Sequence, residues 1–177
     1  MNTFISLKQL WYGDVMTEAP TAANIATLVK DSKFTEVKNV HGDTWGYEES
    51  DPETTEYMNA LTGVNYYVDM TKQGVPTIKF TMGEYEYKQK ADLQGGKVIT
   101  GTNTSAVGWQ KATELAIVYK SVVALSKTGV YIVFPKAQIT GKGDTQEKNI
   151  GLGVTALCVE PDTAGLSAEY WLKSDAK

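Results

Sequence analysis

The chain has 177 residues, a formal net charge of −4, one cysteine and one histidine. This length is sufficient for one domain with a sizeable apolar core, so residues 1–177 are interpreted as a single domain. The acidic balance offers no basic patch for nucleic-acid phosphates, and one cysteine excludes an intrachain disulfide. No run of about 20 apolar residues is present to span a membrane. Residues 1–7 lack the basic and apolar regions of a secretory signal, which predicts synthesis in a cytoplasm.

Three short segments of the first 40 residues have a recognisable apolar pattern. Residues 5–12 alternate apolar and polar side chains, which predicts a strand. Residues 21–30 follow a proline and carry an apolar stripe at helical spacing, which predicts a helix. Residues 34–40 are a weaker strand candidate, because their two valines are out of phase with strand alternation.

Residues 43–56 are the most polar stretch of the chain and hold six carboxylates. A run so rich in like charge does not fold onto a core, which predicts a long protruding loop at about residues 43–61. Large aromatic side chains within such a loop indicate packing against a partner, and another copy of the chain is the partner expected. The candidate inter-subunit contact residues are Trp45, Tyr47, Glu48, Glu49, Asp51, Glu53 and Tyr57.

The middle of the chain contains a hairpin pattern and a helix pattern. Residues 64–70 and 78–82 alternate on either side of a short polar segment, which predicts that they pair as a hairpin. Residues 84–93 predict a short helix, because acidic residues precede its lysines and a glycine pair follows it. Residues 98–108 are rich in glycine, threonine and serine and are interpreted as a linker.

Residues 114–159 are expected to hold three consecutive antiparallel strands around which the fold is organised. Residues 114–125 also fit helical spacing, but their β-branched side chains favour a strand. Thr128 and Gly129 predict a tight turn before the second strand. That strand is expected to end at Pro135, because proline cannot donate a hydrogen bond to a ladder.

The third strand of this block follows a polar loop predicted at residues 141–148. Residues 150–158 alternate with period two, which predicts a half-buried strand with Cys158 as a small buried hydrophobe. Residues 170–172 are an apolar segment expected to pack on the domain. The elements together predict a mainly β fold, an antiparallel β-sandwich or barrel of two packed sheets with one or two short flanking helices.

The sequence contains no recognisable catalytic constellation. The carboxylates of residues 48–56 lie in one polar run, so they lack the contrasting environments that separate the pKa values of an acid/base pair. His41 is the only histidine, and no Gly-x-Ser-x-Gly elbow accompanies it. A zinc site needs several histidines or cysteines, and the acidic run has the oxygens for a calcium ion but not the spacing of an EF-hand. The expectation is a protein that is not an enzyme and holds no cofactor or metal.

The order of features in residues 64–172 resembles that of a known family. Residues 78–98 combine a strand, a short helix and the pair Gly95-Gly96. Residues 108–109 precede a hairpin formed by residues 126–139, and residues 150–157 form an apolar strand after a loop. This order is similar to that of bacteriophage major tail tube proteins, which are related to type VI secretion tube proteins. The N-terminal third of the chain, with its early predicted helix, corresponds less well to the family.

The resemblance implies a structural subunit that assembles with copies of itself into hexameric rings, which stack into a hollow tube. DNA would be passing cargo without specific binding, other tail proteins would be further partners, and no membrane would be involved. The location would be the virion tail, after synthesis and assembly in the bacterial host cytoplasm. The loop at residues 43–61 would contact the neighbouring ring.

Two other functions are compatible with the residues. The aromatic side chains of Trp45, Tyr47, Tyr66 and Tyr67 fit a non-enzymatic β-sandwich module that binds carbohydrate or protein in a virion or an adhesin, because aromatic rings stack on sugar faces. A hydrolase that uses Glu48 and Glu49 is the third hypothesis.

Overall fold

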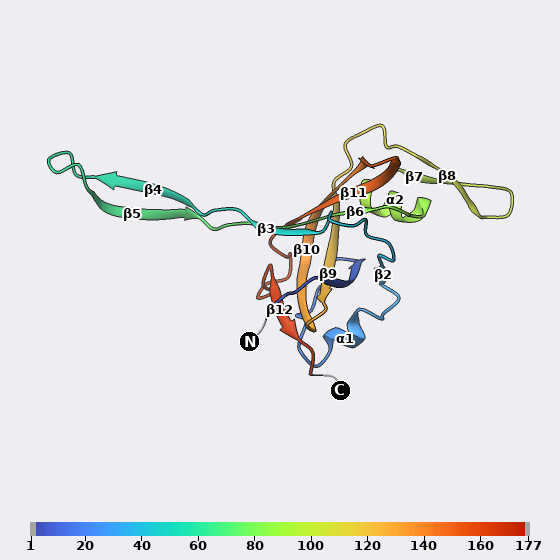
Figure 1. Ribbon diagram of the computed structural model, residues 1–177, viewed down its shortest axis with the longest axis horizontal. Coiled ribbons are helices and arrows are strands. Elements are labelled where there is room, and N and C mark those ends of the chain that lie inside the picture. The colour runs from blue at the N-terminus through green and yellow to red at the C-terminus, as the bar shows by residue number, and fades with distance from the viewer. Residues whose placement is uncertain (1–2, 176–177) are drawn as a thin grey trace.

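Antiparallel strands dominate the structure, a computed structural model that describes residues 3–175 (Figure 1). Strand residues make up 49% of the chain and helical residues 7%, which confirms the predicted mainly β class. The elements are β1 (Leu7–Gly13), α1 (Ile25–Leu28), β2 (Phe34–Glu36), β3 (Gly46–Glu49), β4 (Glu53–Met58), β5 (Asn65–Lys72), β6 (Pro76–Met82), α2 (Tyr87–Gln94), β7 (Lys97–Thr100), β8 (Ala106–Gln110), β9 (Val118–Ser126), β10 (Val130–Gln146), β11 (Asn149–Cys158) and β12 (Tyr170–Lys173).

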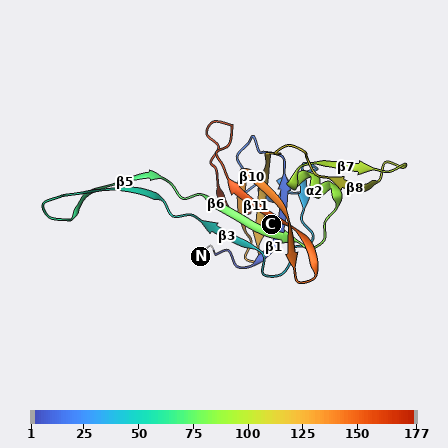
Figure 2. The same ribbon diagram turned by 90° about the horizontal axis from the view of Figure 1, so that it is seen from above.

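One eight-stranded sheet forms the body of the molecule. Its strand order is β2-β1-β9-β10-β11-β6-β3, and β12 pairs with the first part of β10. The sheet bends so that β6 and β11 cover the same apolar core as β1 and β9, which gives the predicted sandwich (Figures 1 and 2). The two layers are therefore continuous through β10. In the described part of the chain β2 and β3 do not pair with each other, so the sheet does not close into a barrel.

The bend lies in β10, at the proline that was predicted to end a strand. Phe134 pairs with Val122 and Ala137 pairs with Lys120, so β10 contains one extra residue, a β-bulge, between these pairs. Pro135 sits in this bulge, where its missing N–H is not needed, and its carbonyl accepts a hydrogen bond from the Met16 N–H at 3.0 Å. The predicted end at Pro135 is therefore wrong, because the bulge accommodates the proline and the strand continues to Gln146.

The inner face of the bent sheet carries the main apolar core. Strand alternation directs one set of side chains from each central strand inward. The extra residue of the bulge shifts this set in β10 by one position, so that Ile132 and Phe134 face the core before the bulge and Ala137 and Ile139 face it afterwards. Fully buried members include Leu10, Ile78, Val122, Phe134 and Leu152. Leu93 of α2 also joins this core, so the helix closes one side of the sandwich.

The outer face of β1, β9 and β10 is buried as well, under the segment that follows β1. Trp11, Val123 and Val133 alternate with the inward side chains and pack against Ile25 and Val29. These three strands are covered on both faces, which explains their nearly continuous apolar sequences. The helix predicted at residues 21–30 is reduced to the single turn α1; Ile25 and Val29 are buried in this second core and Leu28 packs against it.

Several elements confirm the strand and helix patterns of the sequence. The strands predicted at residues 5–12 and 150–158 correspond to β1 and β11, and the helix predicted at residues 84–93 corresponds to α2. The ambiguous residues 114–125 contain β9, and the apolar tail segment forms β12. Cys158 is buried as predicted. The weaker strand candidate at residues 34–40 shortens to β2.

Three predictions of connectivity are wrong. The hairpin predicted between residues 64–70 and 78–82 does not form, because β5 pairs with β4 while β6 pairs with β3 and β11. The linker predicted at residues 98–108 is instead the hairpin β7–β8. The loop predicted at residues 141–148 is instead the end of β10, to Gln146, followed by a tight turn into β11 with Glu147 at φ 54°. Polar composition hid these strands, since both faces of their outer parts are exposed.

Within residues 3–175, neither helix has the length and apolarity needed to cross a bilayer.

Candidate assembly surface

A two-stranded arm extends away from the body of the molecule (Figure 1). We call residues 50–75, which contain β4 and β5, the long arm. These strands pair only with each other, and every residue of β4 is exposed. Residues 50–61 of the predicted protrusion form the first half of this arm, whereas residues 46–49 are β3 of the main sheet. The arm is a β-hairpin rather than an irregular loop.

The long arm exposes many large apolar side chains. Leu61 at its tip is 95% exposed and Tyr66 is 71% exposed. The exposed apolar members are Tyr57, Met58, Leu61, Val64, Tyr66, Tyr67, Val68 and Met70. Soluble monomers rarely expose a contiguous apolar surface of this kind, which usually marks an interaction site. An isolated two-stranded hairpin is also only marginally stable in water. Both properties favour burial of the arm in an assembly.

The two faces of the long arm differ in their chemistry. Tyr66, Val68 and Met70 alternate along β5 and share one face, on which Val68 lies opposite Glu56. Tyr57 and Tyr67 lie opposite each other on the other face, with ring centroids 5.8 Å apart. One face of the arm therefore carries an apolar stripe, and the other carries a pair of tyrosines.

The polar contacts within the arm are solvent-exposed. Lys72 Nζ lies 3.0 Å from a Glu53 carboxylate oxygen, and Asn65 donates a hydrogen bond of 2.8 Å to Glu56. Exposed pairs of this kind contribute about 0–1 kcal/mol each, so they do not by themselves make the arm rigid.

Aromatic side chains anchor the base of the arm to the body. Tyr47 of β3 stands at right angles to Trp171 of β12, with centroids 5.6 Å apart, and Phe4 stacks on Trp45 at 5.9 Å. The Tyr47 hydroxyl and the Trp171 indole N–H both donate to Glu169 Oε1, at 2.9 and 2.7 Å. Burial, followed by the bond to Glu169, raises the pKa of Tyr47. This cluster fixes the direction in which the chain leaves the body.

The backbone at the base is tightly packed. A Cβ on Gly74 would lie 2.2 Å from the Ser50 carbonyl oxygen, so the close approach of the two strands requires glycine there. Ser50 Oγ accepts a hydrogen bond of 3.0 Å from the Val75 N–H across the same point. The two strands are therefore in close contact at Ser50 and Gly74, where the arm begins.

The predicted contact residues divide between the base and the arm. Trp45 and Tyr47 are partly buried against the core and act as anchors. Glu48 forms an ion pair with Lys79 of β6, and Glu49 is exposed at the end of β3. The three members that lie on the arm itself are Asp51, Glu53 and Tyr57.

A second protrusion lies on the opposite side of the body (Figure 1). We call residues 96–117 the short arm; it contains β7, β8 and the segment leading to β9. Its exposed apolar side chains are Ile99, Val107, Leu115 and Ile117, with Leu115 91% exposed. The predicted linker gave no indication of this exposed apolar surface. The only signal of it in the sequence is the set of isolated apolar residues within 98–117.

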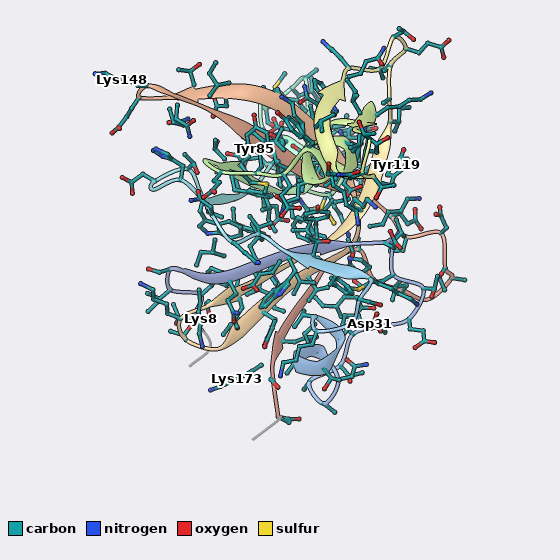
Figure 3. All side chains as sticks on the ribbon, turned by 90° about the vertical axis from the view of Figure 1, so that its right-hand side faces the viewer. Lys8, Asp31, Tyr85, Tyr119, Lys148 and Lys173 are labelled. Atoms are coloured by element: carbon teal, nitrogen blue, oxygen red, sulfur yellow. The ribbon has the colours of Figure 1, made fainter. Side chains whose placement is uncertain are left out.

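Trp109 attaches the short arm to α2 (Figure 3 views the molecule from this side). The Trp109 indole N–H donates to the Gly95 carbonyl at 2.9 Å, and Lys90 Nζ lies 4.5 Å from the ring centroid. Gly95 ends α2 at φ 77°, a conformation that favours glycine. The short arm is thus held against the helix by one aromatic side chain.

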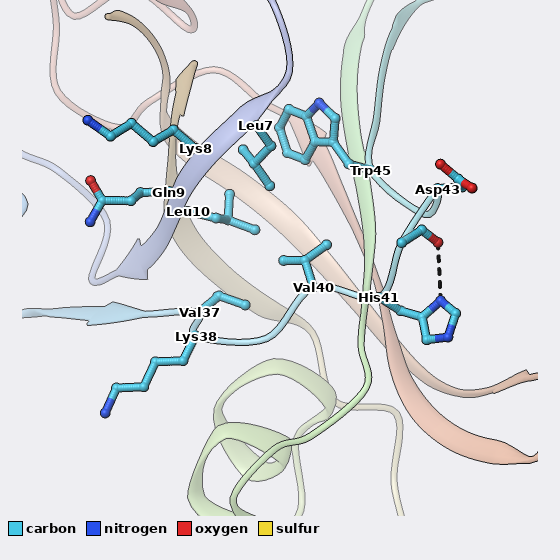
Figure 4. A pocket seen from close by; sticks show the side chains of 11 residues that line it. Leu7, Lys8, Gln9, Leu10, Val37, Lys38, Val40, His41, Asp43 and Trp45 are labelled. Carbon is cyan, nitrogen blue, oxygen red and sulfur yellow. Dashed lines mark hydrogen bonds between the residues drawn. The ribbon is translucent and has the colours of Figure 1, made fainter. Parts of the chain in front are cut away.

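One hollow of the body has His41 at its rim (Figure 4). It measures about 320 Å³ and lies between β1 and residues 37–45. The lining includes Leu10, Val37 and Val40 but no serine, threonine or cysteine. The His41 ring nitrogen Nδ1 lies 3.1 Å from the Gly42 carbonyl.

The acidic residues of 43–56 are spread along β3 and β4. Among residues 3–175, no three His, Cys, Asp or Glu side chains gather in a group that could hold a metal ion. The sequence matches no model of a known protein family, and no match was found among curated proteins.

Proposed function

We propose that this chain is a structural subunit that assembles with copies of itself into stacked rings. The rings would form a tube through which DNA passes, as in the phage tail tubes that the sequence resembles. In this proposal the protein has no enzymatic activity and resides in a virion tail, after assembly in the host cytoplasm. Hexameric rings are the expected form.

The observation that carries the proposal is the long arm. It projects from the body, pairs with no other strand of its own chain, and exposes apolar side chains on both faces. Because apolar burial is worth about 25 cal/mol per Å², a neighbouring copy that covered this surface would gain a substantial driving force. Its two strand edges also offer backbone groups for pairing.

The ends of the main sheet support association as well. In the described part of the chain, β2 and β3 each have a single neighbouring strand, so each leaves one edge open. Open edges are a liability for a monomer, but they become contacts when identical subunits close into a ring.

The charge of the chain suits a channel for DNA. A net charge of −4 provides no surplus of cations to bind phosphate groups. DNA could therefore slide past such a wall without being retained.

The experiment is negative-stain electron microscopy with sedimentation velocity on the concentrated protein. Rings or tubes are expected. The control is a variant in which residues 53–72 are replaced by a short glycine-serine turn; it should keep the β-sheet circular dichroism but fail to form tubes. A wild-type protein that remains monomeric at high concentration would contradict the proposal.

A second candidate function, a non-enzymatic binding module, is favoured by the tyrosines of the long arm. Tyr57 lies near both Tyr66 and Tyr67, with centroids 6.5 and 5.8 Å apart, and all three are exposed. Such rings can stack on sugars. A glycan array with the wild-type protein and a Tyr66→Ala/Tyr67→Ala variant tests this function; binding that is lost in the variant would support it, and an array without hits would reject it.

A further inference from the structure

The long and short arms carry opposite charge. The long arm holds four carboxylates and one lysine, and that lysine is already paired with Glu53. Residues 87–117, which comprise α2 and the short arm, hold four lysines and two carboxylates. One of these carboxylates, Asp92, accepts a hydrogen bond from the Tyr12 hydroxyl and so faces the body.

The lysines around the short arm are available to a partner. Lys88, Lys97 and Lys111 are exposed, and none has an ion pair within residues 3–175. Lys97 and Lys111 line a hollow of about 290 Å³ at the base of the short arm, and the exposed carboxylate of Glu114 lines the same hollow. The exposed Leu115 and Ile117 continue from this hollow toward β9. The surface therefore combines an apolar patch with a rim in which the two lysines outnumber the one carboxylate, Glu114.

The long arm combines apolar side chains with carboxylates, which complements the apolar side chains and lysines of the short arm. Its apolar stripe of Tyr66, Val68 and Met70 is accompanied by Glu56 on the same face, and Asp51 lies exposed near the base. A basic apolar surface and an acidic apolar surface fit each other through burial of the apolar parts and pairing of the charges at the rim.

The two arms of one molecule cannot meet, because they leave the body on opposite sides (Figure 1). We propose that the long arm of one copy docks on the short arm and α2 of the next copy. This inference rests on the proposed function and names the surface that receives the arm. The contact is head-to-tail, so it leaves a free long arm and a free short arm at the ends of every pair. Contacts of this type propagate into rings or filaments.

Charge reversal tests the pairing. One variant is Asp51→Lys/Glu56→Lys on the long arm, and the other is Lys97→Glu/Lys111→Glu on the short arm. All four side chains are exposed, so neither variant should change the melting temperature of the body. Matched controls of equal charge change are Glu18→Lys/Glu160→Lys and Lys30→Glu/Lys33→Glu, whose four residues are exposed and belong to neither arm.

We expect each arm variant alone to need at least about tenfold more protein for half-maximal assembly than its matched control, measured by light scattering and sedimentation at low salt. An equimolar mixture of the two arm variants should recover wild-type assembly, because each reversed arm then meets a reversed partner. Loss in the short-arm variant also distinguishes this contact from one between two long arms, since its long arm is unchanged.

Failure of the proposed arm pairing can be distinguished from failure of the proposed tube function. Wild-type tubes that persist in both arm variants, or a mixture that assembles no better than its components, would overturn the pairing and leave the tube function standing. A wild-type protein that stays monomeric would overturn both.

Discussion

Tyr47 donates a hydrogen bond of 2.9 Å to Glu169, a residue 122 positions later in the chain. The bond joins β3, from which the long arm departs, to the segment that leads into β12. Strand β12 pairs with the first part of β10. Trp171 donates to the same carboxylate oxygen, so Glu169 holds two aromatic side chains together. The orientation of the arm therefore depends on the C-terminal strand.

Replacement Tyr47→Phe should destabilise the protein by about 1 kcal/mol, because it removes one partly buried hydrogen bond and keeps the ring. The change in the free energy of unfolding is measured by urea denaturation. Tyr57→Phe on the exposed arm is the control and should leave the free energy of unfolding unchanged. Equal losses in both variants would show that the bond to Glu169 has no special role.

The stability of the protein should fall as the pH rises above about 10. Burial raises the pKa of Tyr12, Tyr47 and Tyr131 above the ordinary tyrosine value of about 10. A group whose pKa is raised in the folded state stabilises that state fully below its unfolded pKa, and this contribution is lost as the pH climbs toward the folded value. Urea unfolding at pH 8 to 11 measures the slope, which should be smaller in Tyr47→Phe. A slope identical to that of the wild type would contradict the assigned cause.

The Cys158 thiol should be almost unreactive in the folded protein. It is 5% exposed, donates to the Ala168 carbonyl at 3.1 Å, and burial raises its pKa to about 12. Because the thiolate is the reactive form, labelling by a disulfide reagent at pH 8 should be at least about 100-fold slower than in urea. Labelling at the same rate in both conditions would show that β11 does not bury this side chain.

Truncation of Phe134→Ala should cost about 3–5 kcal/mol of stability, as is typical for a fully buried phenylalanine. Phe134 precedes the bulge of β10 and is fully buried where the sheet bends. Leu157→Ala, on the partly exposed side of β11, should cost much less. Chemical denaturation of both variants makes the comparison, and similar losses would place the core elsewhere.

Strand alternation predicted which residues form strands better than it predicted their partners. The alternation of residues 64–70 and 78–82 is real, and it appears in β5 and β6. Alternation records which side chains share a face, however, and not which strand lies alongside. The same limit applies at Pro135, because a bulge that tolerates proline depends on the register between β9 and β10.

The acidic arm could be predicted because its composition excludes it from a core. The role of Trp45 and Tyr47 could not, because their burial depends on Phe4 and Glu169, which are distant in sequence. The short arm was missed since its threonines, serines and glycines resemble those of a linker, although Trp109 pins it to α2.

The apolar stripe of the long arm provides the most direct test of the account. Tyr66→Ser/Val68→Ser changes two exposed side chains, so the melting temperature should stay the same while the protein concentration for half-maximal assembly rises at least about tenfold, equivalent to about 1.4 kcal/mol. Electron microscopy and sedimentation of the wild type and this variant, side by side, make the measurement. Tubes in the wild type and dispersed subunits in the variant are predicted; tubes of equal abundance in both would contradict the claim that the arm holds the assembly together.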